Sequence, residues 1–160
     1  MLTGEALLSV HQRAHRNLQD LLVHCANLES GDLDRNLDGF GYPSIRLQLH
    51  HAIGAEEYWV GVLKGEILVD EDDAAYPAVK DLQAYRERVY DATRAYLADA
   101  GAEDLNTARP LTTWGGRERL LTPAFVILRT VTHLYHHQGQ VTAMCRLLGK
   151  PVSGLDFPLT

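Results

Sequence analysis

Three histidines lie close together late in the chain: His133, His136 and His137. His133 and His137 are four residues apart, so on an α-helix their rings lie one turn apart on the same face. With this spacing a helix can present two imidazole nitrogens to one metal ion. A further histidine is available upstream, in the pair His50 and His51. The function therefore depends on whether these residues meet in space.

A helical wheel separates the three late histidines. At about 100° per residue, His137 lies about 30° and His133 about 70° from the centre of the apolar stripe, whereas His136 lies about 130° away. We therefore expect His133 and His137 to face inward and His136 to face outward. The stripe consists of Val126, Ile127, Leu134, Val141, Met144, Cys145 and Leu148.

The same wheel on the upstream helix places His51 roughly 80° from the centre of its stripe and His50 nearly opposite it. His51 is then expected to reach a neighbouring helix, and His50 is not. Neutral nitrogens from His51, His133 and His137 would leave a coordination position open, as in catalytic rather than structural metal sites. On spacing alone, the alternative is equally open: inward histidines that only form hydrogen bonds inside the protein.

A second pair, His11 and His15, has the same four-residue spacing in the first helical segment. His11 lies in the apolar seam of that segment. The two could be ligands, core residues or partly exposed side chains, and spacing does not choose between the pairs.

The elements that must position these residues are four helical segments. Their boundaries follow from apolar periodicity and from capping residues such as Ser44, Gly65, Thr122 and Gly149. With no strand-like run, they predict an all-α fold, an antiparallel four-helix bundle in one domain, residues 1–160. The segments run over about 4–29, 43–65, 78–100 and 122–148.

The connection over residues 103–122 is too long for a bundle turn. We expect it to be ordered as a short hairpin over one end of the bundle. The acidic stretch 70–73 is expected to be a solvated loop, and the tail around 155–158 to be extended.

Composition excludes several classes of protein. The hydrophobic fraction is 46% and the charged fraction 22%, which is typical of a globular protein. The net charge is −6 without any run of Lys or Arg, which argues against nucleic-acid binding. No segment resembles a signal peptide or reaches membrane-spanning length. Cys25 and Cys145 are expected to be buried free thiols, so we expect a cytoplasmic protein.

Two segments resemble signatures of the DinB/YfiT family. Residues 51–59 resemble its second-helix signature, a histidine followed by small residues, an acidic residue and aromatics. Residues 133–141, followed by Leu147-Leu148-Gly149, resemble its fourth-helix signature. The resemblance covers essentially the whole chain.

The resemblance implies a four-helix bundle, often a homodimer, that holds a divalent metal with three histidines. Those positions match His51, His133 and His137. His11 and His15 match no ligand position and are expected to be structural. Three imidazoles suit Zn, Ni, Fe and, less well, Mn.

The family includes metal-dependent S-transferases that use low-molecular-weight thiols and thiol-dependent isomerases. Other members are assigned only as hydrolases or stress-induced proteins. The leading hypothesis is a metal that stabilises a thiolate cosubstrate for attack on a small-molecule electrophile. The alternatives are a metal-dependent hydrolase and a non-catalytic, metal-binding stress-response protein. None involves nucleic acid or a membrane.

Other residues are candidates for supporting roles. Glu56 is either a catalytic proton acceptor near the metal or a carboxylate paired with an inward arginine. Tyr58 and Gln140 are expected to line the pocket as binding residues, and Trp59 to lie in the core. A homodimer is expected on the family resemblance and on apolar residues at outer helix edges, namely Leu47, Ile53 and Val60.

Overall fold

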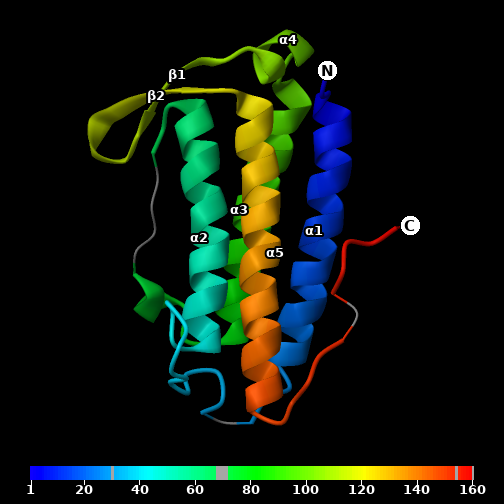
Figure 1. Cartoon of the computed structure of the whole chain (residues 1–160), viewed down its shortest axis with the longest axis vertical. Helices are drawn as coiled ribbons and strands as arrows, with labels where there is room; N and C mark the ends of the chain where they lie inside the picture. The colour runs from blue at the N-terminus through cyan, green and yellow to red at the C-terminus, as the bar shows by residue number, and fades with distance from the viewer. Residues whose placement is uncertain (30, 68–71, 154, 160) are drawn as a thin grey trace.

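The structure is a computed structural model that describes residues 1–29, 31–67, 72–153 and 155–159. It is mostly helical, and the described residues contain five α-helices and one two-stranded sheet. Four long helices lie side by side, and the sheet lies at one end of them (Figure 1). The α-helices are α1 (Gly4–Cys25), α2 (Ile45–Lys64), α3 (Val79–Asp99), α4 (Ala102–Asn106) and α5 (Pro123–Leu147). The strands are β1 (Arg109–Thr113) and β2 (Arg117–Leu121), and the short 3-10 helices are η1 (Asp73–Ala75) and η2 (Trp114–Gly116).

Capping residues set the ends of the long helices. The Ser44 hydroxyl accepts a hydrogen bond from the backbone N–H of Leu47 at the start of α2, and Gly65 ends that helix with a left-handed φ of 75°. α1 ends at Cys25, earlier than the predicted residue 29. The α-helix ends there because the N–H groups of Asn27 and Leu28 donate to carbonyls three residues back instead of four.

The prediction that consecutive helices are antiparallel is wrong for α2 and α3. Arg46 at the start of α2 donates to the backbone oxygen of Asp73, just before α3. At the other end of α2, the Leu63 carbonyl accepts from Arg109, which begins β1 after α3 and α4. The two helices therefore run in the same direction, as Figure 1 also shows.

The length of the connection explains this arrangement. The 14 residues from 65 to 78 separate α2 from α3. Fully extended they would reach roughly 46 Å, more than the roughly 30 Å length of a 20-residue helix such as α2. The chain can therefore return along α2 before α3 begins. Of the acidic stretch, residues 70 and 71 lie outside the described residues, and Asp73 begins η1.

The interior consists of two apolar clusters with buried polar side chains between them. One cluster contains Leu18, Ile53, Val89 and Leu134, and the other contains Leu7, Val62, Leu97 and Ile127. On each helix, buried polar residues fall between the members of the two clusters: His11 and His15 on α1, Glu56 on α2, Thr93 on α3 and Thr130 on α5. Polar functional groups are thus placed at mid-height of the helices.

The connection between α4 and α5 forms an antiparallel hairpin in which Arg109 pairs with Leu121 and Thr113 with Arg117. Gly115 and Gly116 adopt φ values of 70° and 74° at its turn. The backbone N–H of Trp114 donates to the Tyr58 hydroxyl at 2.9 Å, which attaches the hairpin turn to α2.

The burial of several apolar residues and of both cysteines can be compared with the predictions from the sequence. Ile53 and Val60 are buried within the chain, so they cannot support the predicted dimer surface. Cys25 and Cys145 are both buried and free. The tail is bound to α1, since the Asn17 amide donates to the backbone oxygens of residues 155 and 156. No helix among the described residues is long and apolar enough to cross a membrane.

Candidate metal centre

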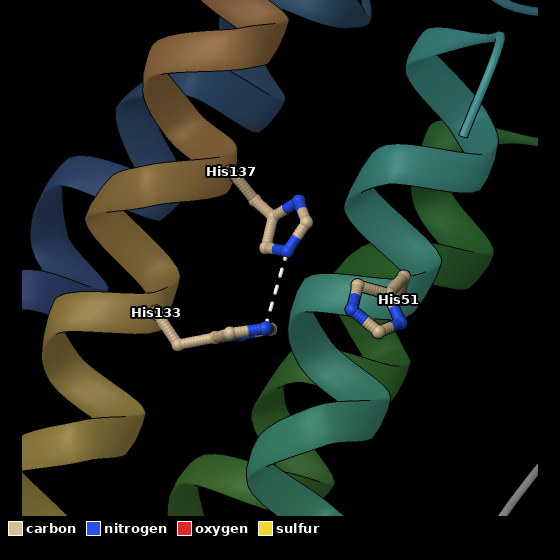
Figure 2. A group of neighbouring side chains, drawn as sticks. All are labelled: His51, His133 and His137. Carbon is tan, nitrogen blue, oxygen red and sulfur yellow. Dashed lines mark hydrogen bonds between the residues drawn. The ribbon is translucent and has the colours of Figure 1, made fainter. Parts of the chain in front are cut away.

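His51, His133 and His137 meet at one point between α2 and α5. Each offers a ring nitrogen, and these atoms all lie within 4.8 Å of one another. The Nε2 atoms of His133 and His137 are 3.2 Å apart, and the ring of His51 approaches from α2 (Figure 2). His137 is buried, whereas His51 and His133 are half-buried. The site thus has one buried and two solvent-accessible imidazoles.

Gln48 determines which nitrogen of His137 is free. The Gln48 side-chain Nε2 donates to the backbone oxygen of Tyr42 at 2.9 Å, which turns its Oε1 toward His137. That Oε1 lies 2.6 Å from Nδ1 of His137, so Nδ1 must carry the proton that is donated. In the neutral ring Nε2 then has a free lone pair, and it is this atom that faces His133.

The environment keeps these imidazoles neutral. Burial, followed by the neighbouring histidines, lowers the pKa of His137 to about 3. Burial, His51 and Arg129 lower the pKa of His133 to about 4. The pKa of His51 is lowered as well, by burial and by His50. Neutral imidazole is the form that binds a metal ion.

The donor set fits a divalent cation. Two nitrogens that each bond a tetrahedral ion at about 2.0–2.1 Å lie roughly 3.3 Å apart, close to the 3.2 Å between His133 and His137. His137 also has the outer-sphere hydrogen bond from Nδ1 that histidine ligands usually make. The three residues could therefore hold one ion.

The other histidines of these two helices lie elsewhere. His136 is exposed, as the helical wheel predicts, and its Nε2 is 3.1 Å from the Gln140 amide. The prediction that His50 cannot reach a neighbouring helix is wrong. His50 is 8% exposed, and its ring lies 5.6 Å from that of Tyr85 on α3. The wheel failed because α2 is covered by α3 on one side and α5 on the other.

A second group of possible ligands comprises His11, His15 and Glu56. Nε2 of His11 lies 2.6 Å from one carboxylate oxygen of Glu56, and Nε2 of His15 lies 2.7 Å from the other. Thr93 donates its hydroxyl to the same carboxylate at 2.6 Å. Burial would raise the pKa of Glu56, but the two histidines and their hydrogen bonds hold it well below its usual range.

These contacts distinguish the two groups. Separations of 2.6 and 2.7 Å are hydrogen-bond distances, shorter than the roughly 3.3 Å expected of two nitrogen or oxygen ligands on one tetrahedral ion. All three side chains are at most 1% exposed. We therefore consider this group a buried hydrogen-bonded network. In this network Glu56 is hydrogen-bonded to two histidines and a threonine, whereas the sequence had suggested an arginine.

A cavity of about 630 Å³ opens beside the three-histidine group. Its lining includes His51 and His133 together with Arg129. Four aromatic side chains contribute to its wall: Tyr42, Tyr58, Trp59 and Trp114. A volume of this size suits a small organic molecule.

The structure places only some of the remaining predicted residues as expected. Tyr58 lines the cavity, and Trp59, expected in the core, is half-buried and also lines it. Gln140 is not among the lining residues, but it lies beside His136, and its hydrogen bond to His137 opposes the lowering of that pKa. The sequence reasoning missed Gln48 and Arg129. Their spacing was a usable signal, since Gln48 precedes His51 by three residues and Arg129 precedes His133 by four.

Comparison with known proteins assigns the family. The model of the DinB superfamily matches residues 13–141, most of the chain. The chain belongs to the DinB superfamily. A crystal structure of a conserved protein from Enterococcus faecalis has a similar fold, with a TM-score of 0.70 and 16% sequence identity. The match covers 94% of this chain and 99% of that one. No curated protein matches the chain. For this DinB superfamily member, the geometry of the site therefore carries the functional argument.

Proposed function

We propose that this chain is a divalent-metal-dependent enzyme that joins a low-molecular-weight thiol to a small electrophile. The observation that carries the proposal is the convergence of His51, His133 and His137, with ligand atoms within 4.8 Å of one another, at the wall of an aromatic cavity. Membership of the DinB superfamily supports it. The proposal treats residues 1–160 as one four-helix-bundle domain with an ordered connection before α5, and the metal as Zn, Ni, Fe or Mn.

The residues have distinct roles. His51, His133 and His137 would hold the ion, and Gln48 orients His137 through the bond to Nδ1. When bound, the ion acts as a Lewis acid that lowers the pKa of a thiol or water ligand and so supplies a nucleophile near neutral pH. The cavity would hold the electrophile beside the ion. A carbon–sulfur bond forms as the leaving group departs, and the thiol proton passes to solvent.

We leave the predicted catalytic role of Glu56 out of this proposal. Its carboxylate is 1% exposed and accepts hydrogen bonds from His11, His15 and Thr93. A proton acceptor must come within hydrogen-bond reach of its substrate. Self-association as a homodimer remains a proposal on family grounds, and sedimentation at micromolar concentration tests it.

Metal content and turnover together test the proposed function. Zinc stoichiometry should fall from one per chain in each of the variants His51→Ala, His133→Ala and His137→Ala. It should survive in His136→Ala, whose ring is exposed. Full stoichiometry in His137→Ala would contradict the assignment, and its loss in His11→Ala, with the fold retained, would favour the second group.

The activity is measured on the metal-loaded protein with 2-mercaptoethanol and, as electrophiles, 1-chloro-2,4-dinitrobenzene and the carboxylate 4-chloro-3,5-dinitrobenzoate. Thiol-dependent product formation that chelation abolishes and a divalent ion restores supports the transferase. Turnover of 4-nitrophenyl acetate without any thiol would instead favour the hydrolase. Metal binding with neither activity would favour the non-catalytic alternative.

A further inference from the structure

The cavity beside the three histidines carries a positive charge without a carboxylate partner. Arg129 lies on α5 one turn before His133 and lines the cavity with it. Its side chain is exposed, and its guanidinium carbon is 5.5 Å from the centre of the Trp59 ring, within the range of a cation–π attraction. Within the described part of the chain, no ion pair involves Arg129. Its hydrogen-bond donors are thus available to a ligand.

One carboxylate in the cavity wall, Asp73, is paired with Arg46, which also pairs with Asp34. Asp73 lines the same cavity, and its Oδ1 accepts a hydrogen bond from Arg46 at 3.0 Å. The chain as a whole has a net charge of −6. The guanidinium of Arg129 is therefore a local positive charge on a protein that is negative overall.

The rest of the wall offers flat apolar surface. The rings of Tyr58 and Trp59 lie 5.0 Å apart at 71°, and the ring of Trp114 lies 6.5 Å from that of Tyr58. Such faces and edges pack against planar or apolar ligand groups. Arginine, in turn, matches the planar geometry of a carboxylate with two parallel hydrogen bonds. The cavity therefore combines an aromatic wall with the exposed cation of Arg129.

We infer that the substrate of this cavity is a small organic carboxylate, whose planar or apolar body packs against Trp59 and Tyr58 and whose carboxylate pairs with Arg129. The inference rests on the proposed function, because the reacting end of the molecule faces the three-histidine group. It assigns to Arg129 a role in substrate binding and selection by charge.

Benzoate and benzamide are the probes, because they have nearly the same shape and differ in charge. Each is titrated into the zinc-loaded protein, with tryptophan fluorescence and calorimetry as the measurements. Benzoate should bind about fivefold more tightly than benzamide, the upper range for a solvent-accessible ion pair. The preference should weaken as salt is added and disappear in Arg129→Gln, with benzamide affinity unchanged.

Arg119→Gln is the matched control. Arg119 and Arg129 line the same neighbouring surface hollow, but Arg119 does not line the cavity. Arg119→Gln removes the same charge, and this variant should keep the preference for benzoate over benzamide. Equal affinities of the two probes, no benzoate binding at millimolar concentration, or a preference that persists in Arg129→Gln would each overturn the inference.

The metal-free protein separates this inference from the proposed function. Benzoate can also bind zinc, so the titration is repeated without metal. If zinc does not bind to the three histidines, the proposed function fails, while a preference that depends on Arg129 remains measurable. If zinc binds as proposed and Arg129→Gln has no effect, only the inference about the carboxylate fails.

Discussion

The side-chain oxygen of Gln48 lies 2.6 Å from Nδ1 of His137, and the Gln48 amide nitrogen donates to a backbone carbonyl at 2.9 Å. Because the amide is held at both ends, it cannot rotate to present its nitrogen to His137. The proton on His137 is thereby confined to Nδ1, and the lone pair of Nε2 faces His133. A residue on α2 therefore sets the chemistry of a histidine on α5.

Replacing this glutamine tests that relationship. Gln48→Met keeps the length of the side chain but removes the acceptor, and we expect zinc affinity to fall about 10- to 100-fold. Gln48→Glu keeps an oxygen acceptor and should retain more of the affinity. Affinity is measured by competition with a chromophoric chelator.

Gln138→Met is the matched control. Gln138 lies on α5 and is buried, as Gln48 is on α2. Its amide atoms make no hydrogen bond among the described residues. Its replacement should leave zinc affinity unchanged. An unchanged affinity in Gln48→Met would show that the hydrogen bond to Nδ1 does not determine metal binding.

The extent of the four long helices could be read from the sequence, but the short helix α4 and the direction of α3 could not. Apolar periodicity and the caps at Ser44, Gly65 and Gly149 locate helix ends within a few residues. The apolar periodicity of a helix is the same whether its neighbour runs parallel or antiparallel to it. The one available signal was the 14-residue connection before α3, longer than the connections of about 2–8 residues usual between helices of a bundle.

The candidate site could also be predicted from helical periodicity, but only in part. The wheel correctly placed His137 inside and His136 outside, because each follows from the stripe of its own helix. It failed for His50, and it could not find the partners of Glu56, because both depend on which other helices pack nearby. The assignment of His51 and its two partners as metal ligands stays a prediction.

The pH dependence of metal binding should reflect the lowered pKa values of the histidines. In the folded metal-free protein, the pKa is about 4 for His133 and about 3 for His137. Protons then compete for His133 and His137 only near and below about pH 4, and for His51 only below its ordinary value, since its pKa is lowered too. Zinc affinity should therefore change little from about pH 7.5 to about pH 6 and should fall most steeply below about pH 4. Ordinary imidazoles would begin to lose affinity near 6.5.

The measurement is a series of zinc titrations at fixed ionic strength, each corrected for protonation of the competing chelator. Circular dichroism at each pH separates proton competition from unfolding. A slope that begins at about pH 6.5 would contradict the environment assigned to His133 and His137.

Glu56 should matter to stability and not to metal binding. In Glu56→Gln, the new amide NH₂ group faces at least one of the donors His11, His15 and Thr93, and a buried donor is left unpaired. We expect a loss of about 1–3 kcal/mol in the free energy of unfolding, with zinc stoichiometry unchanged. Chemical denaturation measures the loss, and Glu57→Gln, at a half-buried position, should cost less.

The same variant should change the response to acid. The pKa of Glu56 is lowered in the folded state, so its contribution to stability is present above the ordinary value of 4.5 and is lost as pH falls below it. The stability of Glu56→Gln should therefore depend less steeply on pH in that range than the wild type. An identical pH dependence in both proteins would show that Glu56 is not held as a carboxylate in the fold.

A hydrogen bond from the hairpin turn to Tyr58 should hold the hairpin against α2. The Tyr58 hydroxyl accepts from the backbone N–H of Trp114 at 2.9 Å. Tyr58→Phe removes this acceptor, so the Trp114 amide proton should exchange with solvent about fivefold faster, as expected for one net hydrogen bond. Because Trp114 forms part of the cavity wall, benzoate affinity should also fall, while zinc stoichiometry stays at one per chain. Tyr135→Phe removes a hydroxyl that contacts Asn17, away from the cavity, and should change neither quantity. Unaltered exchange at Trp114 in Tyr58→Phe would mean that the hairpin is held to α2 by packing rather than by this hydrogen bond.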